Sequence, residues 1–245
     1  MATTINCDMG EGYGLYTLGN DVEFMPFVTH ANIACGFHAS DPSIMWKTVK
    51  DALSLGVQVG SHPGLADREG FGRREMTISR AEVAASVLYQ TGALQAFLTK
   101  EGGSLSYIKA HGALFGMAQK NEDIAHGIAD AAEALQVPTI GFANCALSRV
   151  FEERKIPFAC EFYADLDYDD EGKQIITRVH KPVNVAEAVN KVIKAIDKGT
   201  TTSVSGKEVS VVADTICVHS DTPNGLEVAR AVHKALESRL TVNLV

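Results

Sequence analysis

Seven short apolar runs alternate with longer helical patterns along the 245 residues of this sequence. The runs are too continuous for a sheet with one solvated face, and they are typical of parallel strands covered on both faces. Most runs are followed by a helical pattern, as in repeated βα units. The predicted strands are Thr3–Cys7, His30–Cys35, Val57–Ser61, Ser106–Ala110, Pro138–Ala143, Phe158–Tyr163 and Val209–His219, the last with a bend or bulge at Asp214.

Capping signals mark where the helices begin. Ser40 or Asp41 precedes Pro42, which suits a first helical turn. Ser79 and Glu82 have the spacing of a capping box. Further helices are predicted to begin at Asn121, Ala146, Asn184 and Asn224. Because no linker or low-complexity tract divides the chain, residues 1–245 are expected to form one domain.

Polar side chains fall at or just after the end of each predicted strand. A doubly wound sheet would spread such residues along one edge, whereas a barrel gathers all strand ends around one mouth. The pattern therefore favours an α/β fold that is a (β/α) barrel of about seven parallel strands, with its site at the mouth. The residues are Asn6, Asp8, Glu11, Asn32, His38, His62, Lys109, His111, Asn144, Glu161, Asp165, His219 and Asp221.

The stretch "SYIKAHGALF" shows this pattern most sharply. Lys109 and His111 stand two residues apart at the end of an apolar strand, so both are expected to point into the mouth. A single buried histidine is more often held by a backbone partner than catalytic, and the joint pattern carries the inference. His30, His126, His180 and His233 are interpreted as lying outside the site.

A charged, glycine-rich loop follows the third predicted strand, "GLADREGFGRREM" from Gly64 to Met76. Its arginines, Arg68, Arg73 and Arg74, could bind a carboxylate or phosphate if the loop closes over the mouth. The alternative is a solvated loop whose charges pair with one another.

The amino-acid composition limits the classes of molecule that this protein is expected to bind. The net charge of −8 argues against nucleic acid or an anionic membrane surface as a partner. No apolar run reaches the roughly 18 residues that a membrane span requires, and the first residues do not have the pattern of a signal peptide. The five cysteines are odd in number and lack a C-x-x-C motif, which predicts reduced thiols in a cytoplasmic protein.

Six strings together resemble the lactam-utilisation (LamB/YcsF) family: "NCDMGEGYG", "ANIACGFHASDP", "GSHPGLADREGFGRREM", "IKAHGALF", "EFYAD" and "ICVHSDTP". The resemblance spans the chain and implies a distorted barrel of the glycoside hydrolase/deacetylase type. The implied reaction is ATP-dependent ring opening of 5-oxo-L-proline to L-glutamate, performed together with the B and C subunits of 5-oxoprolinase. The sequence departs from the family pattern at His30, Phe115, Gly116, Leu166 and Ser220, which bears on which lactam is held.

ATP is expected to bind a partner rather than this chain. The strings "SGKEVS" and "EGKQ" lack the upstream glycine and the hydroxyl residue of a P-loop. Opening a stable five-membered cyclic amide with water alone has little favourable free energy. Coupling to ATP hydrolysis on another polypeptide would supply that free energy.

Lactam hydrolysis requires a base for water, a stabiliser for the oxyanion and an acid for the leaving nitrogen. The predicted base is Asp8 or Glu161, since burial can raise the pKa of a carboxyl group. Lys109 and His111 are predicted to stabilise the oxyanion or an acyl-phosphate-like group delivered by the partners. The acid would be His38, His62 or His219. The substrate carboxylate would bind Arg68, Arg73 or Arg74. The residues that would help to position substrate or water are Asn6, Glu11, Asn32 and Asp165.

A divalent metal remains open at this point. Asp8, His38, His62 and His111 offer suitable ligand types, but none are spaced as neighbours on a helix. Two other functions also stay open. One is a stand-alone metal-dependent amidohydrolase or deacetylase, and the other is a regulatory protein that only binds an anionic metabolite.

Overall fold

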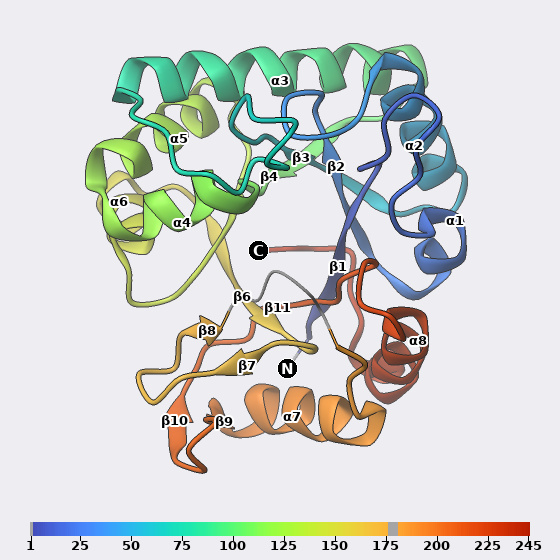
Figure 1. The fold of residues 1–245 in the computed structure, drawn as a ribbon, viewed down its shortest axis with the longest axis vertical. Helices are drawn as coiled ribbons and strands as arrows, with labels where there is room; N and C mark the ends of the chain where they lie inside the picture. The colour runs from blue at the N-terminus through green and yellow to red at the C-terminus, as the bar shows by residue number, and fades with distance from the viewer. Residues whose placement is uncertain (1, 176–180) are drawn as a thin grey trace.

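The computed structural model describes residues 2–175 and 181–245, and its centre is a closed barrel of seven parallel strands (Figure 1). Strand β1 pairs with β2 on one side and with β11 on the other, which closes the ring. The predicted seven-stranded (β/α) barrel is thereby confirmed. In ring order the strands are β1 (Thr4–Met9), β11 (Thr215–Cys217), β6 (Phe158–Tyr163), β5 (Thr139–Gly141), β4 (Leu105–Ile108), β3 (Gln58–His62) and β2 (His30–Ala34).

Helices surround this barrel (Figure 1). The predicted caps are confirmed at Asp41, Ser79, Asn121 and Asn184, whose side chains accept hydrogen bonds from the first turn of the helix that follows. The helices are α1 (Asp21–Phe24), α2 (Pro42–Ser54), α3 (Arg80–Lys100), α4 (Gly112–Lys120), α5 (Glu122–Leu135), α6 (Ala146–Arg154), α7 (Val185–Lys198) and α8 (Gly225–Leu236), with 3-10 turns at Met25–Phe27 and Glu237–Arg239.

Helix α4 has no counterpart among the predicted helices. It begins directly after His111, which occupies the N-cap position but whose side chain does not cap the helix, and Gly112 has a φ of +51°. Neither feature resembles a capping signal in sequence. As a consequence, His111 lies at the junction between a strand end and a helix N-terminus.

The predicted strand Val209–His219 is wrong as a single element. Its first part is β10 (Glu208–Ser210), which pairs antiparallel with β9 (Thr200–Thr202) outside the barrel, and β11 starts at Thr215. Between them the Asp214 carboxylate accepts a hydrogen bond of 2.8 Å from the Cys160 N–H, so the chain bends there. A second hairpin, β7 (Asp167–Tyr168) and β8 (Gln174–Ile175), lies near the first, and both are beside α7 (Figure 1).

Strand β1 shows why the barrel has a polar interior. Ile5, Cys7 and Met9 are fully buried and belong to the apolar core. The alternate residues Asn6 and Asp8 instead contact Lys109 inside the barrel. The strand therefore separates an apolar layer under the helices from a polar interior.

None of the described helices combines the length and the apolar character that crossing a bilayer requires. His180 lies outside the described residues.

Candidate active site

A cavity of about 80 Å³ opens at the carboxyl ends of the barrel strands. Lys109 and His111 both line it, as expected from their spacing. The other lining residues are Asp8, Glu11, His62, Arg73, Ala110, Gly112, Phe115, Tyr163, Leu166, His219, Ser220 and Asp221. A larger cavity of about 710 Å³ lies beside α7, but of the residues predicted for the site only Asp165 lines it.

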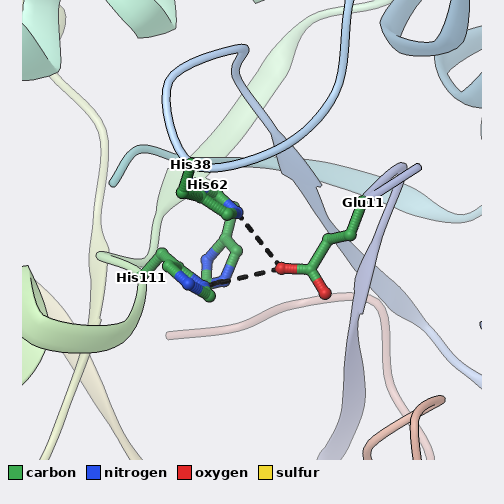
Figure 2. Close-up of side chains that lie close together, drawn as sticks. All are labelled: Glu11, His38, His62 and His111. Atoms are coloured by element: carbon green, nitrogen blue, oxygen red, sulfur yellow. Dashed lines mark hydrogen bonds and ion pairs between the residues drawn. The ribbon is translucent and has the colours of Figure 1, made fainter. Parts of the chain in front are cut away.

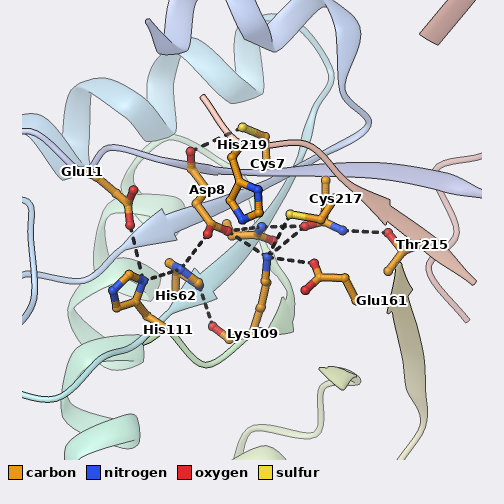
Figure 3. Close-up of polar contacts among 12 residues, drawn as sticks. Cys7, Asp8, Glu11, His62, Lys109, His111, Glu161, Thr215, Cys217 and His219 are labelled. Carbon is orange, nitrogen blue, oxygen red and sulfur yellow. Dashed lines mark hydrogen bonds and ion pairs between the residues drawn. The ribbon is translucent and has the colours of Figure 1, made fainter. Parts of the chain in front are cut away.

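Lys109 is the centre of the acidic half of the site (Figure 3). Its Nζ lies 2.9 Å from Asp8 Oδ1 and 2.8 Å from Glu161 Oε1, and it also donates to Asn6 Oδ1 and to Cys217 Sγ. Burial alone would lower the pKa of Lys109, but the two carboxylates outweigh it and raise that pKa well above its ordinary value. Lys109 is therefore protonated, and its positive charge balances the negative charges of Asp8 and Glu161.

Glu161 does not line the cavity. Its side chain is fully buried and forms an ion pair with Lys109, and the residue lines a separate cavity of about 240 Å³. Glu161 thus supports Lys109 from below rather than facing the space where a ligand would lie.

Asp8 is fixed from three directions. Asn32 Nδ2 donates to it at 2.7 Å, Lys109 donates at 2.9 Å, and His62 Nε2 lies 3.3 Å away. Burial acts to raise the pKa of Asp8, but His62 and Lys109 outweigh it and hold that pKa well below its ordinary value. The upward shift that sequence reasoning expected for a carboxyl group here is found instead at Glu11, where burial raises the pKa.

Three histidines and Glu11 form the second half of the site (Figure 2). The rings of His38 and His111 are stacked, with 3.6 Å between centroids and 5° between planes. Glu11 Oε1 lies 3.1 Å from His38 Nε2 and 3.5 Å from His111 Nδ1, and His62 Nε2 lies 3.0 Å from His111 Nδ1. The ligand atoms of these four residues all lie within 4.8 Å of one another, so the cluster could hold a metal ion.

Backbone carbonyls fix which ring nitrogens face the cluster. His62 Nδ1 lies 2.8 Å from the Lys109 carbonyl oxygen, and His111 Nε2 lies 2.8 Å from that of Phe71. A carbonyl can only accept, so these two nitrogens carry protons, and the opposite nitrogen of each ring faces the cluster. Burial, and then the neighbouring imidazoles, hold the pKa values of His38 and His111 well below the ordinary value, which keeps both rings neutral.

His219 and Asp165 form a separate pair at the far side of the cavity. His219 Nδ1 lies 2.9 Å from Asp165 Oδ1, and its backbone N–H donates to Asp165 Oδ2 at 2.9 Å. Burial alone would lower the pKa of His219, but Asp165 raises it to about 9. The ring also stacks on Tyr163, with 2° between the two planes.

The arginine loop contributes one side chain to the cavity rather than three. Arg73 lines it and lies 3.6 Å from Asp221. Arg74 pairs with Asp67 and Glu69, and Arg68 donates to the Gly36 carbonyl. The loop nevertheless covers the histidines, because the ring of Phe71 packs edge-on against His38 and His111.

The remaining predicted residues lie beneath the cavity or away from it. Asn6 and Asn32 bond to each other at 2.8 Å inside the barrel and fix the Asp8 side of the network. His30 is buried, with Thr29 Oγ1 2.8 Å from its Nδ1. Tyr163 was not predicted to belong to the site. It follows Glu161 by two residues on β6, so the two side chains lie on the same face of the strand. The same spacing, between Lys109 and His111, was used to predict that those two residues share a face.

Three positions at which the sequence departs from the family pattern line the cavity: Phe115, Leu166 and Ser220. Two of them are apolar and nearly buried, with 5% and 6% of Phe115 and Leu166 exposed. The departures therefore fall where a ligand would be contacted.

Comparisons with known proteins find relatives that match almost the whole chain. The profile of the LamB/YcsF family matches residues 3–243. The 5-oxoprolinase A subunit of Bacillus cereus strain AH820 is 41% identical over 239 residues, which cover 95% of this chain and 94% of that protein. The lactam utilization protein lamB of Emericella nidulans is 40% identical over 237 residues, covering 95% and 93%. The crystal structure of the lactam utilization protein from Thermus thermophilus superposes with a TM-score of 0.90 at 37% identity, covering both chains completely.

Proposed function

Because the chain belongs to the LamB/YcsF family, we propose that it is the lactam-opening subunit of an ATP-dependent 5-oxoprolinase. In this proposal it hydrolyses the cyclic amide bond of 5-oxo-L-proline to give L-glutamate, together with B and C subunits that bind ATP. The observation that carries the proposal is the convergence of Asp8, Lys109, His62, His111 and His219 on one cavity, in a chain 41% identical to a protein named as the A subunit of 5-oxoprolinase.

Asp8 would orient the attacking water. It lines the cavity and is ionised, whereas Glu161 is shut off behind Lys109. Glu11, whose pKa is raised, is the better proton acceptor of the two carboxylates at the cavity. The roles divide accordingly: without a metal, Asp8 would hold the water and Glu11 would take its proton, a role that Glu11 gives up where it binds an ion.

Lys109 and His219 supply the positive charge that the reaction needs. The ammonium group of Lys109 lies at the cavity wall, where it would stabilise the oxyanion that forms on the lactam carbonyl. His219, held protonated by Asp165, would give its proton to the leaving nitrogen as the ring opens. Arg73, at the rim, would bind the substrate carboxylate.

The donor set fits a divalent ion of the zinc class. Ligand atoms at about 2.0–2.1 Å around a tetrahedral ion lie roughly 3.3 Å apart; three of the six pairs here are separated by 3.0, 3.1 and 3.5 Å, and all six lie within 4.8 Å. His62 and His111 also donate their other N–H to backbone carbonyls, as metal-binding histidines do. Glu11, His38, His62 and His111 would hold such an ion, which when bound would lower the pKa of water and polarise the amide carbonyl.

Reconstitution tests the proposal directly. The purified chain should release glutamate from 5-oxoproline only with the B and C subunits and ATP. The Asp8→Asn and Lys109→Ala variants should lose at least 100-fold in turnover in the assembled complex, a typical cost for such roles. Turnover of ATP and 5-oxoproline by the chain alone, or near wild-type turnover in both variants, would contradict it.

A second candidate is a stand-alone metal-dependent amidohydrolase that acts on another small cyclic amide or an N-acyl substrate. The cluster of Glu11 with three histidines favours it, because such a site can activate water without ATP. It predicts turnover by the isolated metal-loaded chain, which the same assay without partners or ATP would detect.

A further inference from the structure

The loop between β1 and α1, together with the first turn of α1, exposes an unusual run of apolar side chains. Five of the ten residues from 13 to 22 are large, apolar and exposed. Single exposed apolar residues are ordinary, but a contiguous group marks an interaction surface. The group, called here the loop patch, consists of Tyr13 (46% exposed), Leu15 (99%), Tyr16 (80%), Leu18 (39%) and Val22 (57%).

The loop patch is presented on an ordered turn. Tyr13 and Tyr16 exchange two backbone hydrogen bonds, each of 2.8 Å, so Gly14 and Leu15 form the tip. The Gly14 N–H is bound by Asp41, which also caps α2, and in Figure 1 this blue segment lies beside α2. The fold thus holds Leu15 out in solvent instead of letting it collapse onto the core.

The same segment also reaches the cavity. Glu11, at its start, is a member of the histidine cluster. At its other end, Gly19 packs so closely on Ser220 that a Cβ there would collide with Ser220 Oγ. Since Ser220 lines the cavity, the loop patch stands beside the mouth.

We propose that the loop patch is where a partner protein of the assembly docks, with an apolar groove of that partner receiving Leu15 and Tyr16. This inference rests on the proposed function, in which a partner must come close to the mouth. A second copy of this chain fits less well. The tip is convex, and two convex tips that meet across a two-fold axis bury little surface.

Arg68 extends the loop patch. Its guanidinium lies over the Tyr13 ring, 3.8 Å from the centroid, and it is tied to the Gly36 carbonyl. Tyrosine and arginine are the residue types enriched in the energetic centres of interfaces. Arg68 does not line the cavity, so docking accounts for a side chain that sequence analysis assigned to substrate binding.

Binding of the variants Leu15→Asp and Tyr16→Asp to purified B and C subunits of 5-oxoprolinase, measured by titration calorimetry, tests the docking site. Each should weaken binding at least 30-fold, the loss expected at an interface hot spot. The matched control is Val204→Asp, because Val204 is 65% exposed in the turn between β9 and β10. Its binding should change less than threefold. Leu15→Ser, a milder change, guards against misfolding, and all variants should keep the wild-type melting temperature.

The outcomes separate the two proposals. Wild-type chain that binds neither subunit would overturn the partner part of the proposed function, and the docking site with it. Wild-type binding with unchanged affinity in Leu15→Asp and Tyr16→Asp would overturn the docking site alone. Sedimentation of the isolated chain as a dimer that these variants dissociate would assign the loop patch to a second copy and also overturn it.

Discussion

The imidazole rings of His38 and His111 lie parallel, with 3.6 Å between their centroids and 5° between their planes. Two charged imidazoles could not share this arrangement, and burial keeps the pKa values of both rings low. The stack therefore presents neutral rings next to the carboxyl group of Glu11, and a neutral imidazole is the form that can bind a metal ion.

Metal binding should depend on this cluster. Wild-type chain purified without a nickel-binding tag and stripped with a chelator should bind about one equivalent of Zn²⁺. Removing one ligand, in Glu11→Gln or His111→Ala, should weaken binding by 10-fold or more. Isothermal titration measures both affinities, and His233→Gln in α8 is a matched control outside the cluster. If all variants bound Zn²⁺ with the affinity of the wild type, the cluster would not be the metal-binding site.

Gly72→Ala should loosen the histidines without removing a ligand atom. Gly72 has a φ of +63°, and a Cβ there would lie 2.7 Å from His38 Cβ and 3.0 Å from His111 Cδ2. The methyl group must push both rings, so the Zn²⁺ affinity should fall while the fold persists. The check is calorimetry together with circular dichroism, and Gly206→Ala, with open space around its Cβ position and a φ of +88°, controls for the backbone strain.

Lys109→Met should destabilise the barrel. It leaves the buried carboxylates Asp8 and Glu161 without their shared cation, and breaking such a pair costs about 3–5 kcal/mol. The free energy of unfolding from urea titration measures the loss. The double variant Lys109→Met with Glu161→Gln should recover much of it yet remain inactive in the assembled complex. Recovery of activity would show that Lys109 acts only as a structural ion.

The Asp165–His219 pair should make stability depend on pH. The folded-state pKa of His219 is raised to about 9, above its ordinary value of 6.5. Its stabilisation is therefore fully present below pH 6.5 and is lost as the pH rises through about 9. The shift corresponds to ~3 kcal/mol. Wild type should exceed His219→Gln in unfolding free energy by about this amount at low pH, and the difference should shrink as the pH passes the raised pKa. A difference that stays constant over this range would mean that the ring is not charged in the fold.

The barrel could be predicted from local signals. Apolar runs, capping residues such as Ser79 and the placement of polar residues at strand ends all act over a few residues. A bend at Asp214 was also predicted, but not the complete split of the last predicted strand, because it depends on the bond between Asp214 and the Cys160 N–H, 54 residues away.

The site was predicted as a set of residues but not as an arrangement. Sequence placed Asp8 with the histidines as a metal ligand, whereas Glu11 is the carboxylate in the cluster. The difference arises in the loop after β1, where Gly10 has a φ of +70° and its N–H is held by Asp21. That turn carries Glu11 over the rings. Gly10 indicates a turn, but the sequence does not reveal the contact with Asp21 that sets its direction.

Lys109 belongs to both halves of this mouth at once. Its carbonyl oxygen orients His62, and its ammonium group neutralises Asp8 and Glu161. A shift of the backbone at the end of β4 would therefore rotate the His62 ring and move the Lys109 ammonium group at the same time. A substitution designed to change the histidine cluster will therefore also perturb the ion pairs of Lys109, and the reverse holds. Variants selected for new substrates should for this reason accumulate their changes elsewhere in the cavity lining, around Phe115 and Leu166.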